Sequence, residues 1–265
     1  MNKILHIILI TLFSFTIISC AKKEESKSSS SSSGTTSQMG GSRQGVELSL
    51  STAVTTLAGT GSSGSANGTG TSASFNYPYG ITTDGTNLYV GDATNHLIRK
   101  IVISTGAVTT VAGTGSSGSA NGTGTSASFY NPIGITTDGT NLYVADDDQS
   151  GLVRQIVIST GVVTTLAGTG SPGSSNGTGT AASFYYPEGI TTDGTNLYVG
   201  DTSNHLIRKI VISTGVVTTV AGTGSSGSAN GTGTSASFGE PKGITTDGTN
   251  LYVGDYGNSV IRQIE

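Results

Sequence analysis

The chain has 265 residues, a net charge of −4, 41 glycines, no tryptophan and only 11% charged residues. This composition excludes long helices as the main elements and suits many short strands joined by turns. From Val46 onward there are seven basic and fourteen acidic residues. Without a cluster of lysine and arginine, a surface that binds nucleic acid by displacing phosphate counterions is excluded.

Residues 1–19 have the features of an export signal: Lys3 is followed by an apolar run over residues 4–18 that is short for a spanning helix. The residues Ile-Ile-Ser-Cys that end at Cys20, the single cysteine, resemble a bacterial lipobox. That resemblance implies cleavage before Cys20 and attachment of a lipid to its thiol. An ordinary secretory signal with an incidental cysteine is the alternative.

Residues 20–45 combine the cysteine with a charged, then Ser- and Gly-rich segment that has almost nothing to bury. Such a composition predicts a flexible tether. We therefore expect a protein anchored in the cell envelope, at the outer membrane or cell surface, with its folded domain over residues 46–265.

The rest of the chain is a repeat. The sequence GTGSSGSANGTGTSASF occurs at residues 59–75, 113–129 and 222–238, with a near copy at 168–184. Four GITTDGTNLYV segments begin at Gly80, Gly134, Gly189 and Gly243, so the period is 54, 55 and 54 residues. A period near fifty with short apolar runs is typical of propeller blades.

Each repeat predicts four antiparallel strands; in the first they are residues 81–83, 88–90, 98–103 and 107–113. The turn Asp84-Gly85-Thr86-Asn87 joins the first two, because these residue types tolerate tight-turn dihedrals. Residues 51–59 resemble a fourth strand without its first three, and residues 243–264 resemble three strands without a fourth. We therefore expect an all-β, four-bladed propeller closed by the N-terminal strand joining the last blade.

The repeats resemble those of the NHL family, whose signature tripeptide is found at residues 95–97 and 204–206. The match also covers the Pro-x-Gly before the first strand, the Asp after the second and the Ile-Arg-Lys/Gln-Ile strand. Members of that family usually form six-bladed rings. An open or paired assembly is thus the alternative to a closed ring of four blades.

Strand alternation places the loops after strands two and four on one face, and long loops on a rigid scaffold are common binding sites. The repeats differ from one another mainly on this face, before strand one and after strand two. The resulting candidates for contact with a protein or glycan partner are Tyr77, Tyr79, Tyr130, Tyr185, Tyr186, Glu188, Glu240, Lys242, Asp147, Asp148 and Tyr256. Ordinary substitutions at the rim of the propeller are the alternative reading.

A carboxylate ends strand two in every repeat and is followed by an arginine. The pairs are Asp92 with Arg99, Asp146 with Arg154, Asp201 with Arg208, and Asp255 with Arg262. We expect local charge-assisted bonds within each pair, in a structural role. A weak Ca²⁺ site is conceivable near Asp146, Asp147 and Asp148, where three carboxylates share one arginine.

The sequence supports a binding or scaffold module more than an enzyme. His96 and His205 alone make a poor zinc site and are expected to serve the hydrogen bonding of their own hairpins. GTGSSG fits G-x-G-x-x-G but opens no helix, so it is not a dinucleotide motif. A metal-dependent lyase or hydrolase using the propeller channel is the alternative; no catalytic residue, cofactor or metal ligand is assigned.

Overall fold

The computed structural model describes residues 50–146 and 151–265, which belong to one compact unit. The predicted export signal, Cys20 and the tether lie outside the described residues, as do Asp147 and Asp148. The described part is all-β, with four antiparallel sheets and short 3-10 turns. No helix in that part has the length and apolar character needed to cross a membrane.

The first three sheets share one strand order, with a two-residue strand beside the outermost long strand. The first sheet contains β1 (Gly68–Thr69), β2 (Pro78–Thr83), β3 (Asn87–Asp92), β4 (Leu97–Val102) and β5 (Ala107–Ala112). The second contains β6 (Gly122–Thr123), β7 (Pro132–Thr137), β8 (Asn141–Asp146), β9 (Leu152–Val157) and β10 (Val162–Ala167). The third contains β11 (Gly177–Thr178), β12 (Pro187–Thr192), β13 (Asn196–Asp201), β14 (Leu206–Val211) and β15 (Val216–Ala221). The fourth contains β16 (Pro241–Thr246), β17 (Leu251–Asp255) and β18 (Val260–Ile264).

Two kinds of 3-10 turn recur in the loops. Those in the long Gly-rich loops are η1 (Gly70–Ser72), η3 (Gly124–Ser126), η4 (Gly179–Ala181) and η6 (Gly233–Ser235). Those after the second long strand are η2 (Ala93–Asn95), η5 (Thr202–Asn204) and η7 (Tyr256–Asn258).

The predicted turn between the first two strands has the expected chemistry. The Oδ1 atom of Asp84 accepts the backbone N–H groups of Thr86 and Asn87 at 2.8 and 2.6 Å, and its Oδ2 accepts the hydroxyl of Tyr89 at 2.9 Å. Gly85 has φ +89°, a conformation that glycine adopts at little cost. The turn therefore fixes the register of the hairpin from local residues alone.

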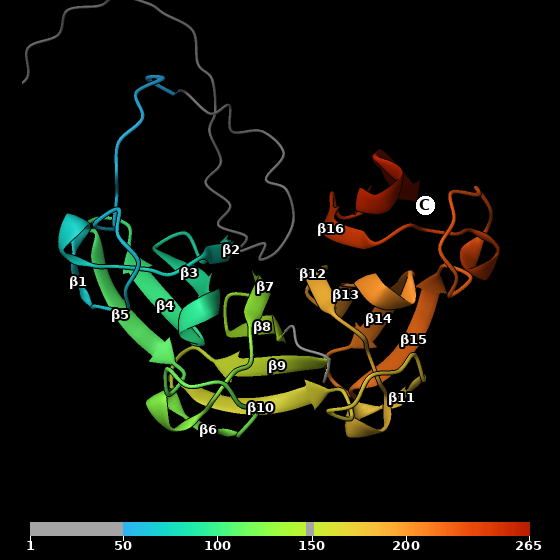
Figure 1. Ribbon diagram of the computed structural model, residues 1–265, viewed down its shortest axis with the longest axis horizontal. Coiled ribbons are helices and arrows are strands. Elements are labelled where there is room, and N and C mark those ends of the chain that lie inside the picture. The colour runs from blue at the N-terminus through green and yellow to red at the C-terminus, as the bar shows by residue number, and fades with distance from the viewer. Residues whose placement is uncertain (1–49, 147–150) are drawn as a thin grey trace, which may run out of the picture. The chain divides into compact units, whose positions relative to one another are not determined.

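The four sheets are the blades of a β-propeller, and they follow one another in chain order in Figure 1. Their inner strands lie next to each other, β2 with β7, β7 with β12, and β12 with β16. The core lies between blades, since one cluster joins Ile98 of the first blade to Phe129 of the second. Equivalent clusters join the second blade to the third and the third to the fourth.

Within residues 50–146 and 151–265, the predicted closing strand is not formed. The fourth sheet has three strands, residues 51–59 make no strand, and no described strand pairs with the outer side of β18. Instead, Gly59 donates its N–H to the carbonyl of Gly70, and Ala58 packs against the first blade. Strand patterning shows which segments can pair, whereas the angle between successive blades decides whether the first and last blades meet. That angle depends on packing between blades, which the repeat pattern does not specify.

Candidate functional site

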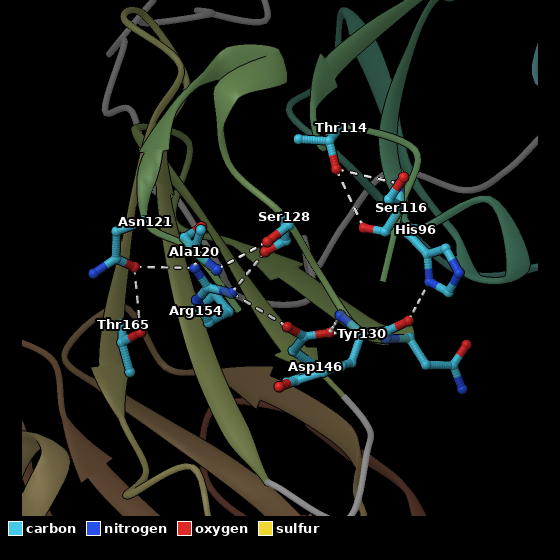
Figure 2. A network of polar contacts seen from close by, with 11 residues as sticks. His96, Thr114, Ser116, Ala120, Asn121, Ser128, Tyr130, Asp146, Arg154 and Thr165 are labelled. Carbon is cyan, nitrogen blue, oxygen red and sulfur yellow. Dashed lines mark hydrogen bonds and ion pairs between the residues drawn. The ribbon is translucent and has the colours of Figure 1, made fainter. Parts of the chain in front are cut away.

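A buried arginine organises the loop-bearing face in each repeat, and Figure 2 shows it in the second blade. The Nη1 atom of Arg154 donates to the carboxylate of Asp146 at 3.3 Å and to the carbonyl of Ser128 at 3.0 Å. Its Nη2 donates to the carbonyl of Ala120 at 3.1 Å and to the Oδ1 of Asn121 at 3.0 Å. The arginine thus ties the end of strand β8 to two points of the long Gly-rich loop.

The four predicted Asp–Arg pairs are all formed. Their N–O distances are 2.8 Å for Arg99 with Asp92, 3.3 Å for Arg154 with Asp146, 2.8 Å for Arg208 with Asp201, and 3.1 Å for Arg262 with Asp255. Each guanidinium also lies over a phenylalanine ring, with 5.1 to 5.2 Å to the ring centroid. These contacts offset the cost of burying the charges. The carboxylates are therefore structural groups engaged with their own arginines.

The same carboxylates also hold the segments that lead into the first strand of each blade. These approach segments are residues 76–79, 130–133, 185–188 and 239–242. The Oδ1 atoms of the four aspartates accept the first backbone N–H of each, at 2.7 Å from Asn76, 2.8 Å from Tyr130, 2.8 Å from Tyr185 and 2.6 Å from Gly239. The approach segments, which differ most among the repeats, are thus held by the aspartates, which are the same in every repeat.

Burial raises the pKa of Asp201, although hydrogen bonds from Tyr185 and Asn204 and the charge of Arg208 act in the opposite direction, and it acts in the same way on Asp146. Burial raises the pKa of Asp146 to about 6, although the charge of Arg154 and hydrogen bonds from Asn131 and Tyr130 act in the opposite direction. In the other three blades the aspartate also accepts a bond from an asparagine, Asp92 from Asn95 at 2.8 Å, Asp201 from Asn204 at 2.9 Å and Asp255 from Asn258 at 2.8 Å. The predicted Ca²⁺ site near Asp146 includes Asp147 and Asp148, which lie outside the described residues, so it stays a prediction.

The two histidines in the described part of the chain connect neighbouring blades, which corrects the expectation that they serve their own hairpins. The Nδ1 of His96 bonds the carbonyl oxygen of Tyr130 in the second blade (Figure 2), and the Nδ1 of His205 accepts the N–H of Glu240 at 3.2 Å in the fourth. Both histidines have φ between 55° and 57° at the end of a 3-10 turn. This left-handed conformation carries the imidazole out of its hairpin and onto the next approach segment, which sequence alone does not reveal.

The asparagine that ends the 3-10 turn after strand two joins the two kinds of loop. The Nδ2 atom of Asn95 donates to the carbonyl of Gly64 in the long loop at 2.8 Å, and Asn204 and Asn258 do the same with Gly173 and Gly227. The loops after strands two and four therefore share a face, as predicted. The asparagines that accept from arginine, such as Asn121, were not selected from the sequence; their recurrence in every Asn-Gly-Thr triplet was the available signal.

The tyrosines among the candidate contact residues fall into two groups by exposure. Tyr77, Tyr79 and Tyr256 are well exposed, with 73, 64 and 66% of their surface accessible. Tyr130, Tyr185 and Tyr186 are half-buried, and the last two stack with ring centroids 5.0 Å apart. Tyr77, Tyr186 and Glu240 have φ of 54°, 51° and 62°, a backbone conformation that L side chains adopt at a cost and that often marks functional loops.

Three candidates from the third and fourth blades meet in one cluster. The Nζ atom of Lys242 lies 3.2 Å from the Oε1 of Glu188 and 4.5 Å from the centroid of the Tyr256 ring. Burial lowers the pKa of Lys242, but the hydrogen bond and charge of Glu188 outweigh it and raise that pKa overall. The cluster brings together an aromatic face, a cation and a carboxylate from two different blades, which could not be inferred from sequence spacing.

Comparison with known proteins supports the identification of the repeats. No profile of a known protein family matches the chain. The chain is 33% identical over 232 residues to "Protein SUPPRESSOR OF QUENCHING 1, chloroplastic" of Arabidopsis thaliana, covering 80% of the chain and 22% of the relative. It is 33% identical over 155 residues to "NHL repeat-containing protein 2" of Bos taurus, covering 52% of the chain and 21% of the relative. The chain thus spans about a fifth of the length of these relatives.

A solved structure gives the same picture of the fold. The chain resembles an auxiliary nutrient binding protein from Bacteroides ovatus with a TM-score of 0.58 and 20% identity, over 73% of this chain and 49% of that one. At this identity the likeness concerns the fold alone. The repeats, the blades and these comparisons agree: the chain has homologues that are NHL repeat-containing proteins, and its described residues form a four-bladed β-propeller.

Proposed function

We propose that the protein is a binding or scaffold module that presents its loop-bearing face to a protein or glycan partner, and that a lipid on Cys20 anchors it in the cell envelope. The observation that carries the binding proposal is the exposure of Tyr77, Tyr79 and Tyr256 on a framework held by buried Asp–Arg pairs. Rigid aromatic side chains give large contact areas at a low cost in conformational entropy.

The Lys242 cluster adds polar specificity to this surface. Glu188 and Lys242 are each partly accessible, with 14 and 35% of their side chains exposed, so a ligand that stacks on Tyr256 could exchange hydrogen bonds with both. Hydroxyl groups of a glycan or polar groups of a peptide suit such a site. The nutrient-binding description of the Bacteroides ovatus protein supports this proposal by analogy of fold.

The binding proposal is tested on a glycan array and with cross-linked proteins from the cell envelope, using the labelled Cys20→Ser chain. Replacing Tyr77 and Tyr79 by alanine should lower retention of the partner about tenfold or more, as expected for aromatic contact residues. The matched control is Tyr198→Phe, because the Tyr198 hydroxyl bonds Asp193 in a tight turn of the opposite face. Equal binding by the tyrosine variant and the control would refute the assignment of this face.

The anchor is tested separately by fractionating cells that produce the chain with Cys20 or with Cys20→Ser. If a lipid is attached, we expect the protein with Cys20 in the membrane fraction and the Cys20→Ser protein in the soluble envelope fraction. The substitution removes the thiol that carries the lipid, and with it the attachment to the membrane. A Cys20→Ser chain that stays firmly in the membrane would refute it.

A further inference from the structure

The fourth blade has an unfilled side where another blade would fit. In the first three blades a glycine of the inner strand faces the backbone of the following blade so closely that a Cβ would clash: Gly80 faces the carbonyl of Ile133, Gly134 that of Glu188, and Gly189 that of Lys242. The equivalent Gly243 has nothing within 4 Å of such a Cβ. Beside it, Ile261 is 76% exposed, although its counterparts Ile98, Val153 and Ile207 are fully buried.

The first blade has the complementary unfilled side. In the later blades an isoleucine packs its Cγ2 over the glycine of the preceding blade, as Ile135 does on Gly80, Ile190 on Gly134 and Ile244 on Gly189. The corresponding Ile81 is 61% exposed. Its neighbour Phe75 is only half-buried, whereas Phe129, Phe184 and Phe238 are buried completely or nearly so.

The segment before the first blade fits the outer edge of the fourth. Residues 53–58 read AVTTLA, and the outermost long strands β5, β10 and β15 read AVTTVA, VVTTLA and VVTTVA. The second residue of each of these strands is a buried valine that pairs with an isoleucine of the next strand inward. The pairs are Val108 with Ile101, Val163 with Ile156, and Val217 with Ile210. Val54, at the same position, is 97% exposed, and no described strand pairs with the matching Ile264 on that side.

We propose that these surfaces form one interface between two copies of this chain, docked head to tail. The first blade of one copy fills the open side of the fourth blade of the other, and its residues 53–58 become the outer strand beside β18. The partner is a second copy because the chain already makes this contact three times with nearly identical residues. The interface brings the backbone of Tyr79, whose side chain is a proposed contact residue, against the fourth blade, so it is tested by a disulfide that forms without any ligand.

A recurring hydrogen bond from a threonine of the outer strand to an asparagine supports the same register. In the first three blades a threonine of the outer strand donates to the asparagine that also binds the buried arginine: Thr110 to Asn67, Thr165 to Asn121, and Thr219 to Asn176, at 3.3 to 3.4 Å. In the fourth blade Asn230 binds Arg262 at 3.0 Å, and no threonine reaches it from the described residues of the same chain. When Val54 of the second copy lies opposite Ile264, Thr56 of that copy lies opposite Arg262, as Thr110 lies opposite Arg99 in the first blade. There it takes the place of the missing threonine beside Asn230.

Head-to-tail docking closes with two copies when each interface turns one copy by half a circle relative to the other, and the proposal expects this ring with two equal interfaces. It also pairs the free edge of β18, which otherwise offers a template for uncontrolled strand addition. Residues 53–58 thus gain the strand partner that their sequence pattern predicts, but they gain it on a second copy and not within one chain.

The test is a disulfide between the proposed partners, made in the full chain with Cys20→Ser. One chain carries Val54→Cys and another carries Ile264→Cys; mixed under mild oxidation, they should yield a covalent heterodimer, because directly paired residues have Cα atoms close enough for a disulfide. The matched control is Thr55→Cys with Ile264→Cys, since a shift of one residue turns the thiol to the other face of the sheet. We expect about tenfold less heterodimer in the control.

Gly243→Ala supplies a second measurement. Its Cβ meets nothing in a single copy, so the variant should keep its circular dichroism spectrum, yet the carbonyl of Tyr79 from the second copy would clash with it. Light scattering should give the mass of two copies for the parent chain and of one copy for Gly243→Ala. A parent chain that stays monomeric at high concentration, or no disulfide between positions 54 and 264, would overturn the proposal. So would a disulfide that forms only within one chain carrying both cysteines.

Discussion

Replacing Arg208 by methionine tests the role of the buried Asp–Arg pairs most directly. The side chain is fully buried and donates four hydrogen bonds, two of them from Nη1 to Asp201 at 2.8 Å and to the carbonyl of Ser183 at 3.0 Å. Methionine fills part of the volume but leaves the carboxylate of Asp201 buried without a cation. Breaking a buried pair in this way costs about 3–5 kcal/mol of unfolding free energy.

The chain contains its own comparison, because Arg262 makes the same four bonds with 11% of its side chain exposed. Water and counterions reach that site, so Arg262→Met should cost about half as much in the monomeric Gly243→Ala background. The double variant Asp201→Asn with Arg208→Met should recover part of the loss, since no unpaired charge remains.

Urea unfolding followed by circular dichroism at pH 7 measures these differences as shifts of the midpoint at constant slope. Raising the salt concentration should change the Arg208 result little, because salt screens buried pairs much less than exposed ones. Equal losses for Arg208→Met and Arg262→Met, or a loss below about 1 kcal/mol for the first, would refute the view that the buried pair supports the face.

Three further predictions concern the turns and the contacts between blades. Burial alone would raise the pKa of Asp84, but hydrogen bonds from Asn87, Thr86 and Tyr89 lower it to about 2; its stabilising effect is present above about pH 4 and is lost as the pH falls towards 2. The urea midpoint of the Asp84→Asn variant should therefore fall less than that of the parent chain as the pH is lowered from about 4 towards 2. Gly134→Ala should cost at least about 2 kcal/mol in the same assay, because the Cβ meets the backbone of the next blade. His205→Ala should cost about 1 kcal/mol, as expected for one lost hydrogen bond to the next blade, and an unchanged midpoint would show that the bond is dispensable.

Several features followed from the sequence because they depend on residues close together in the chain. The Asp84 turn, the strand hairpins and the Asp–Arg pairs each lie within one repeat, so local residue types determine them. Repetition of the whole unit then predicted identical blades, and alternation of strand direction predicted which loops share a face.

The remaining features depend on how one blade packs on the next. The bonds from His96 and His205 to neighbouring blades, and the Lys242 cluster, join residues from different repeats. The predicted closing strand is not formed within the described residues for the same reason, since the outer-strand pattern of residues 51–59 carries no distance to β18. The sequence by itself determined what each blade is and what its edges can pair with. Only the tertiary structure decided which edges meet, because that depends on how blades pack on each other, as at Gly80, where the backbone of the next blade leaves no room for a Cβ.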